Sequence, residues 1–168
     1  MKVRSETIGL VAVCLSMSLG TASAQAPPGG EKGSAMTSQA SGTFDVKLAP
    51  SEAGPGSLAS GRLTFDKTFR GDLEGSSKGE MWTADTAVKG SAGYVAIEKI
   101  SGTLRGRNGG FTLLHRGTMR QGGEFDMNIV VVPDSGTGAL AGLAGTMTII
   151  LADGKHSYAF DYTLPDTP

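Results

Sequence analysis

Cysteine and histidine are both scarce in this sequence of 168 residues. Cys14 is the only cysteine, and it lies in an apolar N-terminal stretch that we expect to be removed, so the folded part has neither a disulfide nor a cysteine nucleophile. His115 and His156 are the only histidines and do not form an H-x-H or H-x-x-x-H spacing. The sequence therefore predicts no resident metal and no cofactor.

An excess of charge is also missing. The whole chain carries a net charge of −1 and its first 24 residues carry +1, which leaves −2 for the remainder. Such a near-neutral surface gives no electrostatic reason to bind nucleic acid or an anionic membrane. The apolar stretch at 8–19 is shorter than the roughly 20 residues of a membrane-spanning helix, so we expect no membrane insertion.

The N-terminus has the pattern of a secretory signal peptide. Lys2 and Arg4 precede the apolar stretch, and Ala22-Ser23-Ala24 supplies a small-residue cleavage site. We expect residues 1–24 to be the signal, which places the protein in the periplasm or outside the cell. Residues 25–41, rich in Pro, Gly, Ser and Ala, are expected to be a disordered tether. Residues 42–165 are long enough for one domain with a core.

Glycine is abundant, and beyond the tether it falls between short runs of alternating apolar and polar residues, which is typical of strands and turns. No segment shows the spacing of an amphipathic helix. Eight strands are predicted at 43–48, 62–69, 79–85, 93–106, 110–119, 124–132, 145–151 and 155–164. A weak echo, Gly-x-Leu-x-Gly at 71–75, 102–106 and 138–142, indicates bends or bulges rather than a repeated site.

The links between these runs predict an antiparallel arrangement. Asp153-Gly154 is a strong hairpin signal, and parallel strands would need long crossovers. Eight antiparallel strands favour a closed barrel, because closure removes exposed edges. The fold class is therefore all-β, a single-domain eight-stranded antiparallel barrel. A barrel of this size is either filled by side chains or holds one small ligand.

Four ionisable residues share strand faces with apolar ones. Glu98 follows Tyr94 in the alternation of "GYVAIEKI", His115 follows Phe111 in "GFTLLHR", and His156 begins the aromatic row of "HSYAFDYTL". Glu80 lies two residues before Trp82. Charged groups on apolar faces are costly unless they are paired, so each should meet a partner inside the barrel or lie at its mouth.

Three interpretations of these residues stay open. In the structural one, Glu98 or Glu80 bonds to a histidine or to a rim arginine, Arg105 or Arg107, and nothing is catalysed. In the catalytic one, Glu98 is a base or charge stabiliser and His115 or His156 is its acid partner. In a third, the two histidines and one glutamate form a metal site of the two-histidine-one-carboxylate type.

Three consecutive motifs carry a family resemblance. "GYVAIEKISGTLRGRNGGFTLLHRGTM", "VVVPDSGTGALAGLAGTMTI" and "DGKHSYAFDYTLP" resemble the DUF3224 family of bacterial proteins of unknown function, over about residues 42–165. That family resembles the allene oxide cyclase barrel, which implies an allene oxide cyclase-like fold of eight antiparallel strands with a cavity. Since such cyclases form trimers, the resemblance also admits a homo-oligomer. It implies the barrel and not the reaction.

The leading functional prediction is an exported barrel that binds a small lipophilic or amphipathic molecule in its interior. The first alternative is an isomerase or cyclase acting on a lipophilic substrate, and the second is a structural or partner-binding module. The candidate catalytic residues are Glu98, His115 and His156. The candidate ligand-binding residues are Glu80, Trp82, Tyr94, Arg107, Tyr158 and Phe160.

Overall fold

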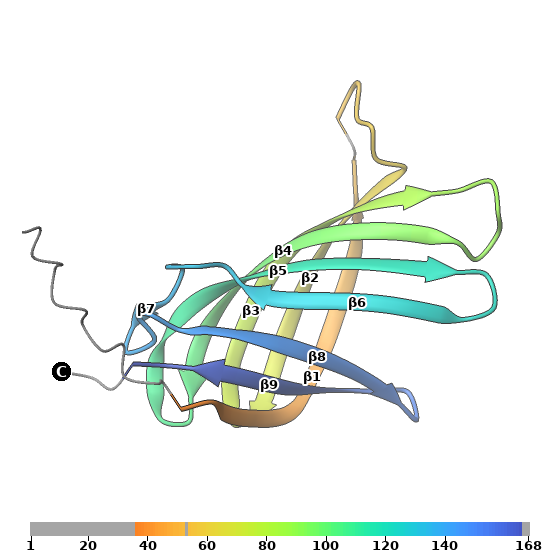
Figure 1. Cartoon of the computed structure of the whole chain (residues 1–168). Coiled ribbons are helices and arrows are strands. Elements are labelled where there is room, and N and C mark those ends of the chain that lie inside the picture. The colour runs from red at the N-terminus through yellow and green to blue at the C-terminus, as the bar shows by residue number, and fades with distance from the viewer. Residues whose placement is uncertain (1–35, 53, 166–168) are drawn as a thin grey trace, which may run out of the picture. The chain divides into compact units, whose positions relative to one another are not determined.

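The computed structural model describes residues 36–52 and 54–165, and in them it shows strands and turns without a helix (Figure 1). Eight long strands carry the fold. Their bounds are β1 Ser38–Ser51, β2 Gly61–Gly71, β3 Leu73–Asp85, β4 Ala92–Leu104, β5 Arg107–Arg120, β6 Glu124–Val131, β8 Ala144–Ala152 and β9 Lys155–Thr163. A ninth strand, β7 (Thr137–Gly138), lies in the glycine-rich loop and pairs with the start of β5.

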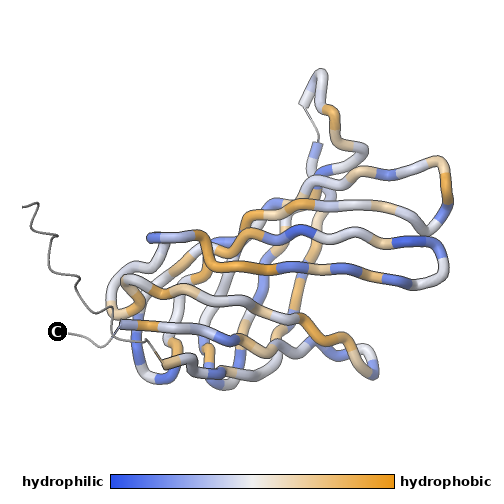
Figure 2. The backbone as a smooth tube through the Cα atoms, in the orientation of Figure 1, coloured by the Kyte–Doolittle hydropathy of each residue, from blue (hydrophilic) through white to orange (hydrophobic). Residues whose placement is uncertain are grey.

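The eight long strands form a closed antiparallel barrel. The hydrogen-bonded order runs from β4 through β3, β2, β1, β9, β8 and β6 to β5, and β5 pairs with β4 to complete the ring. The join between β4 and β5 extends from Ala92 opposite Met119 to Leu104 opposite Arg107. Hydrophobic and hydrophilic residues alternate along most strands, so that one face of each strand turns to the core (Figure 2).

One join in the ring is short. β6 and β8 pair only through Ile129 with Met147 and Val130 with Thr146. The beginning of β6 and the end of β8 therefore have no partner across this join, although each pairs on its other side with β5 or β9. The barrel is fully hydrogen-bonded around one end and parted between β6 and β8 toward the other.

The closed end lies where the loop 132–143 crosses the barrel. Leu140 and Leu143 of this loop are buried, and they join Leu73 and Leu104 in the core. The central leucine of each Gly-x-Leu-x-Gly echo is thus a core residue. The phenol of Tyr158 also belongs here, because its oxygen accepts a hydrogen bond from the Leu73 amide at 2.8 Å. This end is filled by packed side chains.

The opposite end, which we call the open end, lies at the turns 86–91, 121–123 and 153–154 and at the loop after β1. Asp153 and Gly154 both have positive φ, as the hairpin signal predicts. In Figure 1 the hairpins at this end spread apart on the right-hand side. The barrel therefore differs at its two ends, with a packed floor and a wider mouth.

The eight predicted strands and the all-β barrel are confirmed. Two boundaries differ most. β1 begins at Ser38 and not near Gly42, because Ala40 is buried in the core and pairs with Phe160 of β9. β3 begins at Leu73 and not at 79, because Leu73 is a core residue. The predicted signal peptide, 1–24, lies outside the described residues, as does most of the predicted tether. In the part of the chain that the structure describes, no helix has the length and hydropathy needed to cross a membrane.

Candidate functional site

A cluster of polar side chains lies inside the barrel, between the closed and open ends. Glu98 of β4 is completely buried and contacts Lys67 of β2, Ser77 of β3 and His115 of β5, all of them buried as well. We call these four residues the buried charged cluster. Adjacent strands bring them together, since Glu98 lies one strand away from both Ser77 and His115.

The Glu98 carboxylate is the centre of the cluster. Lys67 Nζ donates a hydrogen bond to Glu98 Oε2 at 2.8 Å, and Ser77 Oγ donates one to Glu98 Oε1. His115 Nε2 lies 2.9 Å from Glu98 Oε2, outside the direction of a regular hydrogen bond. Both carboxylate oxygens thus have donors, which is the condition for burying a charged carboxylate.

These contacts lower the pKa of Glu98 below its ordinary value of 4.5. Burial is the largest single influence and acts to raise the pKa, but it is outweighed by the contact with His115, the charge and hydrogen bond of Lys67, and the hydrogen bond of Ser77. Glu98 is therefore ionised at neutral pH and forms a buried ion pair with Lys67.

The lowered pKa predicts a stability that depends on pH. The stabilisation by ionised Glu98 is complete above the ordinary pKa of 4.5 and is lost as pH falls from there through the lowered pKa of the folded state. Urea titrations should show the gap in unfolding free energy between wild type and Glu98→Gln narrowing from about pH 5 downward. A gap of constant size down to the acid transition would show that folding does not lower the pKa of Glu98.

Aromatic rings surround the Lys67 ammonium. Its Nζ lies 4.8 Å from the ring centroid of Phe44, 5.1 Å from that of Phe65 and 5.8 Å from that of Phe69. Cation–π attraction of this kind stabilises an ammonium that has left water. His156 does not join the cluster; its ring packs on Phe44, with the two centroids 5.1 Å apart.

Apolar side chains continue from the cluster to the open end without becoming fully buried. They share the strand faces of the core residues, yet each is partly or largely exposed. We call them the open-end residues: Leu48, Leu63, Met81, Tyr94, Met119, Phe125, Met127, Ile149 and Leu151. The mouth of the barrel thus has an apolar lining that the described residues leave uncovered.

Tyr94 is the open-end residue nearest to the cluster on β4. Its ring fills the space opposite Gly117, where any side chain would collide with it, and stacks on Phe125 with centroids 6.5 Å apart. Partial burial raises the pKa of its phenol. Tyr94 can therefore offer both an aromatic face and a neutral hydroxyl to a molecule in the mouth.

The structure brings together only two of the predicted catalytic residues, Glu98 and His115. Tyr94 lies on the inner face, as expected. Tyr158 and Phe160 also face inward, but they are packed into the closed end and have no access to the mouth. Arg107 lies at the closed end too, where its guanidinium donates to the Pro165 carbonyl at 3.1 Å.

Glu80 and Trp82 are placed differently from the expectation that they line the interior. Both are on the outer face of β3, where Glu80 forms an ion pair with Arg62 at 2.6 Å. The inner face of β3 carries mainly small residues, among them Ser77 and Gly79. A side chain at position 79 would collide with the Phe65 ring, so this inner position must be glycine. The sequence of β3 therefore shows no apolar residue at this point of its inner face.

Lys67 and Ser77 belong to the buried charged cluster, but the sequence analysis missed them. A signal for Lys67 exists: in "RLTFDKTF" it occupies the same strand face as Leu63, Phe65 and Phe69, so it is a cation on an apolar row. Ser77 has no comparable signal, since a serine between glycines fits a turn equally well. In the described residues, no three His, Cys, Asp or Glu side chains gather as a metal would require.

Fold and site together define a small, closed antiparallel barrel with a charged cluster at its centre and an apolar mouth. Residues 40–162 match the family model described as "Protein of unknown function (DUF3224)". The chain belongs to this family, which confirms the resemblance found in its motifs. No curated protein matches the chain.

A solved structure supports the same assignment. It is a protein of unknown function from the DUF3224 family of Shewanella oneidensis MR-1, 46% identical in sequence, with a TM-score of 0.71. The match covers 78% of this chain and 100% of that protein. The two chains share the barrel over their common length.

Proposed function

We propose that this protein binds a small, mostly apolar or amphipathic molecule in the open end of its barrel. The observation that carries the proposal is the set of open-end residues, which face inward and still remain exposed. Covering exposed apolar surface of this kind with a ligand stabilises the complex. Small-molecule sites combine such an apolar lining with a few polar groups, and here the neutral hydroxyl of Tyr94 is a polar group within the lining.

The contacts favour binding over catalysis. A general base must reach the proton that it removes, directly or through one water. Glu98 and His115 lie close together, as an isomerase or cyclase would need, but Glu98 is completely buried and its two oxygens are already occupied by Lys67 and Ser77. β6 and β8 are paired through only two residue pairs, so this join is the place where the barrel could open to admit a ligand with the least loss of hydrogen bonds.

Export is part of the proposal and depends on the predicted signal peptide. A binding protein in the periplasm or outside the cell would meet small lipophilic molecules before they enter the cytoplasm. Mass spectrometry of the protein from its native host tests this part directly. An N-terminus at Gln25 in the periplasmic or secreted fraction is expected, and a full-length cytoplasmic protein would contradict it.

The binding site can be tested with methyl-labelled methionine in NMR spectra. Met81, Met119 and Met127 are open-end residues, whereas Met147 is buried in the core and Met36 lies at the exposed start of the described chain. Dodecanoate, decanol and a hydroxylated naphthalene should serve as probes. We expect at least one of them to shift the three open-end methyl signals and leave those of Met36 and Met147 in place.

The same probe should raise the unfolding temperature. A ligand present at about one hundred times its dissociation constant adds about 2.7 kcal/mol to the free energy of unfolding. If no probe moves the three methionine signals, or if the signals of Met36 and Met147 move equally, the open end is not a binding site. Stabilisation without movement of these methyl signals would place the ligand elsewhere.

A further inference from the structure

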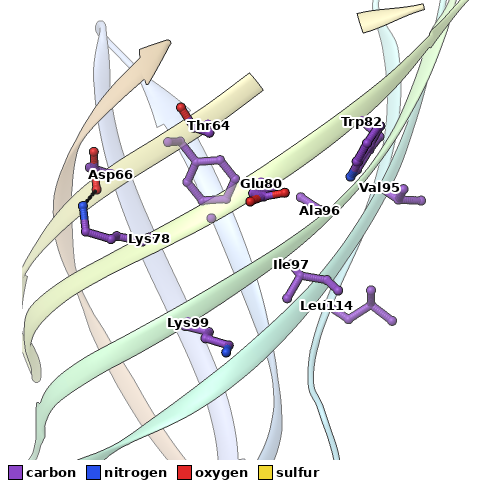
Figure 3. A pocket seen from close by; sticks show the side chains of 12 residues that line it. Thr64, Asp66, Lys78, Glu80, Trp82, Val95, Ala96, Ile97, Lys99 and Leu114 are labelled. Carbon is purple, nitrogen blue, oxygen red and sulfur yellow. Dashed lines mark hydrogen bonds and ion pairs between the residues drawn. The ribbon is translucent and has the colours of Figure 1, made fainter. Parts of the chain in front are cut away.

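A second hollow lies on the outside of the barrel. It has a volume of about 880 Å³ and crosses the outer face of β2, β3, β4 and the adjoining part of β5 (Figure 3). We call it the outer groove. These long strands bend strongly along their length (Figure 1). The outer face of the sheet is therefore convex around the barrel but concave in the direction of the strands. Its walls belong to fully paired strands, which makes the groove preformed.

One wall of the outer groove is apolar. Val95 and Ile97 of β4 are 52% and 55% exposed, and Leu114 of β5 and Trp82 of β3 are 44% and 37% exposed. The strand register makes them one patch, because Val95 lies opposite Trp82 and Ile97 lies opposite Leu114. The guanidinium of Arg62 lies 5.0 Å from the Trp82 ring centroid and holds that ring in position. A contiguous apolar patch on an otherwise polar outer face indicates a binding surface.

Among the described residues, some charged side chains around this wall have an ion-pair partner and one does not. Glu80 is paired with Arg62, and Lys78 is paired with Asp66, each at 2.6 Å. Lys99 lies directly opposite Lys78 in the register but forms no ion pair in the part of the chain that the structure describes (Figure 3). The Lys78 ammonium is turned toward Asp66 and neutralised by it (Figure 3). An anion beside Lys99 would give its ammonium a counter-charge.

We propose that the outer groove binds a small organic anion with an apolar body. The body lies on Val95, Ile97 and Leu114 against the edge of Trp82, and the anionic group is held by Lys99. The two carboxylates of the groove are neutralised by their own partners, so they do not oppose an anion at the lysine end. The volume lies within the range of small-molecule sites, roughly 300–1,000 Å³. This site is separate from the open end and does not depend on it.

Two probes with the same body and different charge test the proposal. 1-Anilinonaphthalene-8-sulfonate (ANS) carries a sulfonate, and N-phenyl-1-naphthylamine is its neutral counterpart. Trp82 is the only tryptophan of the chain, so its fluorescence and its indole NMR signal report on the groove alone. We expect ANS to quench Trp82 and shift its indole signal, and the neutral probe to bind more weakly.

Three variants locate the anion and the apolar body. Lys99→Gln should weaken ANS binding at Trp82 about three- to fivefold, the effect of one exposed charge pair, and leave the neutral probe unaffected. Lys89→Gln removes the same charge from an exposed loop and should change neither. Ile97→Glu places a carboxylate on the apolar wall and should reduce the binding of both probes about tenfold or more.

Several results would overturn the proposal. One is equal loss of ANS binding in Lys99→Gln and Lys89→Gln, which would mean a nonspecific charge effect. Another is a shift of the open-end methionine signals with no change at Trp82, which would assign the anion to the mouth of the barrel. A third is a stable oligomer in light scattering that Ile97→Glu converts to a monomer, since the groove would then be an interface between copies.

Discussion

Glu98→Gln should lower the free energy of unfolding by about 3–5 kcal/mol at neutral pH, because it leaves the Lys67 ammonium buried without its counter-charge. Lys67 is almost completely buried and has Glu98 as its only ion-pair partner in the described residues. The three surrounding phenylalanine rings attract the ammonium but do not replace a carboxylate. Urea denaturation followed by circular dichroism measures the loss.

A double variant separates the ion pair from the rest of the contacts. Lys67→Met with Glu98→Gln removes both charges at similar volume, so it should recover much of the stability that Glu98→Gln loses. Glu74→Gln, an exposed carboxylate on β3, is the control and should change stability by less than about 0.5 kcal/mol. If the double variant is no more stable than Glu98→Gln, Lys67 and Glu98 do not form a buried ion pair in the folded protein.

Phe160→Ala should cost about 3–5 kcal/mol, the usual range for emptying a buried phenylalanine site. Its ring is buried at the closed end and stacks on Phe111 with centroids 5.7 Å apart and on Tyr162 with centroids 5.2 Å apart. Removing it opens a cavity that two neighbouring rings cannot fill without leaving their own contacts. Chemical denaturation of the purified variant provides the measurement.

Phe125→Ala is the matched control for this substitution. The same residue type is about half exposed at the open end, where it contacts Tyr94. We expect a loss well below that of Phe160→Ala, since less apolar surface returns to water and no cavity forms. Equal losses for the two variants would mean that the open end is packed as tightly as the closed end, which would also count against ligand binding there.

The barrel could be predicted from the sequence because strand alternation and turn chemistry are local properties. The Asp153-Gly154 hairpin needs only positive φ at two adjacent residues, and short links impose antiparallel neighbours without reference to the rest of the chain. The Gly-x-Leu-x-Gly echo also corresponds to packing, because its central leucines, Leu73, Leu104 and Leu140, are core residues.

The site was harder to predict because it depends on what lies across the barrel. Glu98 and His115 were recognised as ionisable groups on apolar rows, but Lys67 was overlooked although it lies on the apolar row of Leu63, Phe65 and Phe69. The face of β3 was misassigned because Gly79 must be small to admit Phe65 from β2. Whether an inward residue meets a packed floor, as Tyr158 does, or an open mouth, as Tyr94 does, is a tertiary property.

The short join between β6 and β8 is the place where this barrel can open locally. Two residue pairs hold it, whereas β4 pairs continuously with both β3 and β5 over its whole length. Amide hydrogens of Ile129 to Val131 and Thr146 to Thr148 should therefore exchange with solvent through local opening, at a lower free energy than those of β4. An opening confined to this join turns the ring into a curled sheet for a moment, so access to the interior through this side would depend on two residue pairs and not on global unfolding.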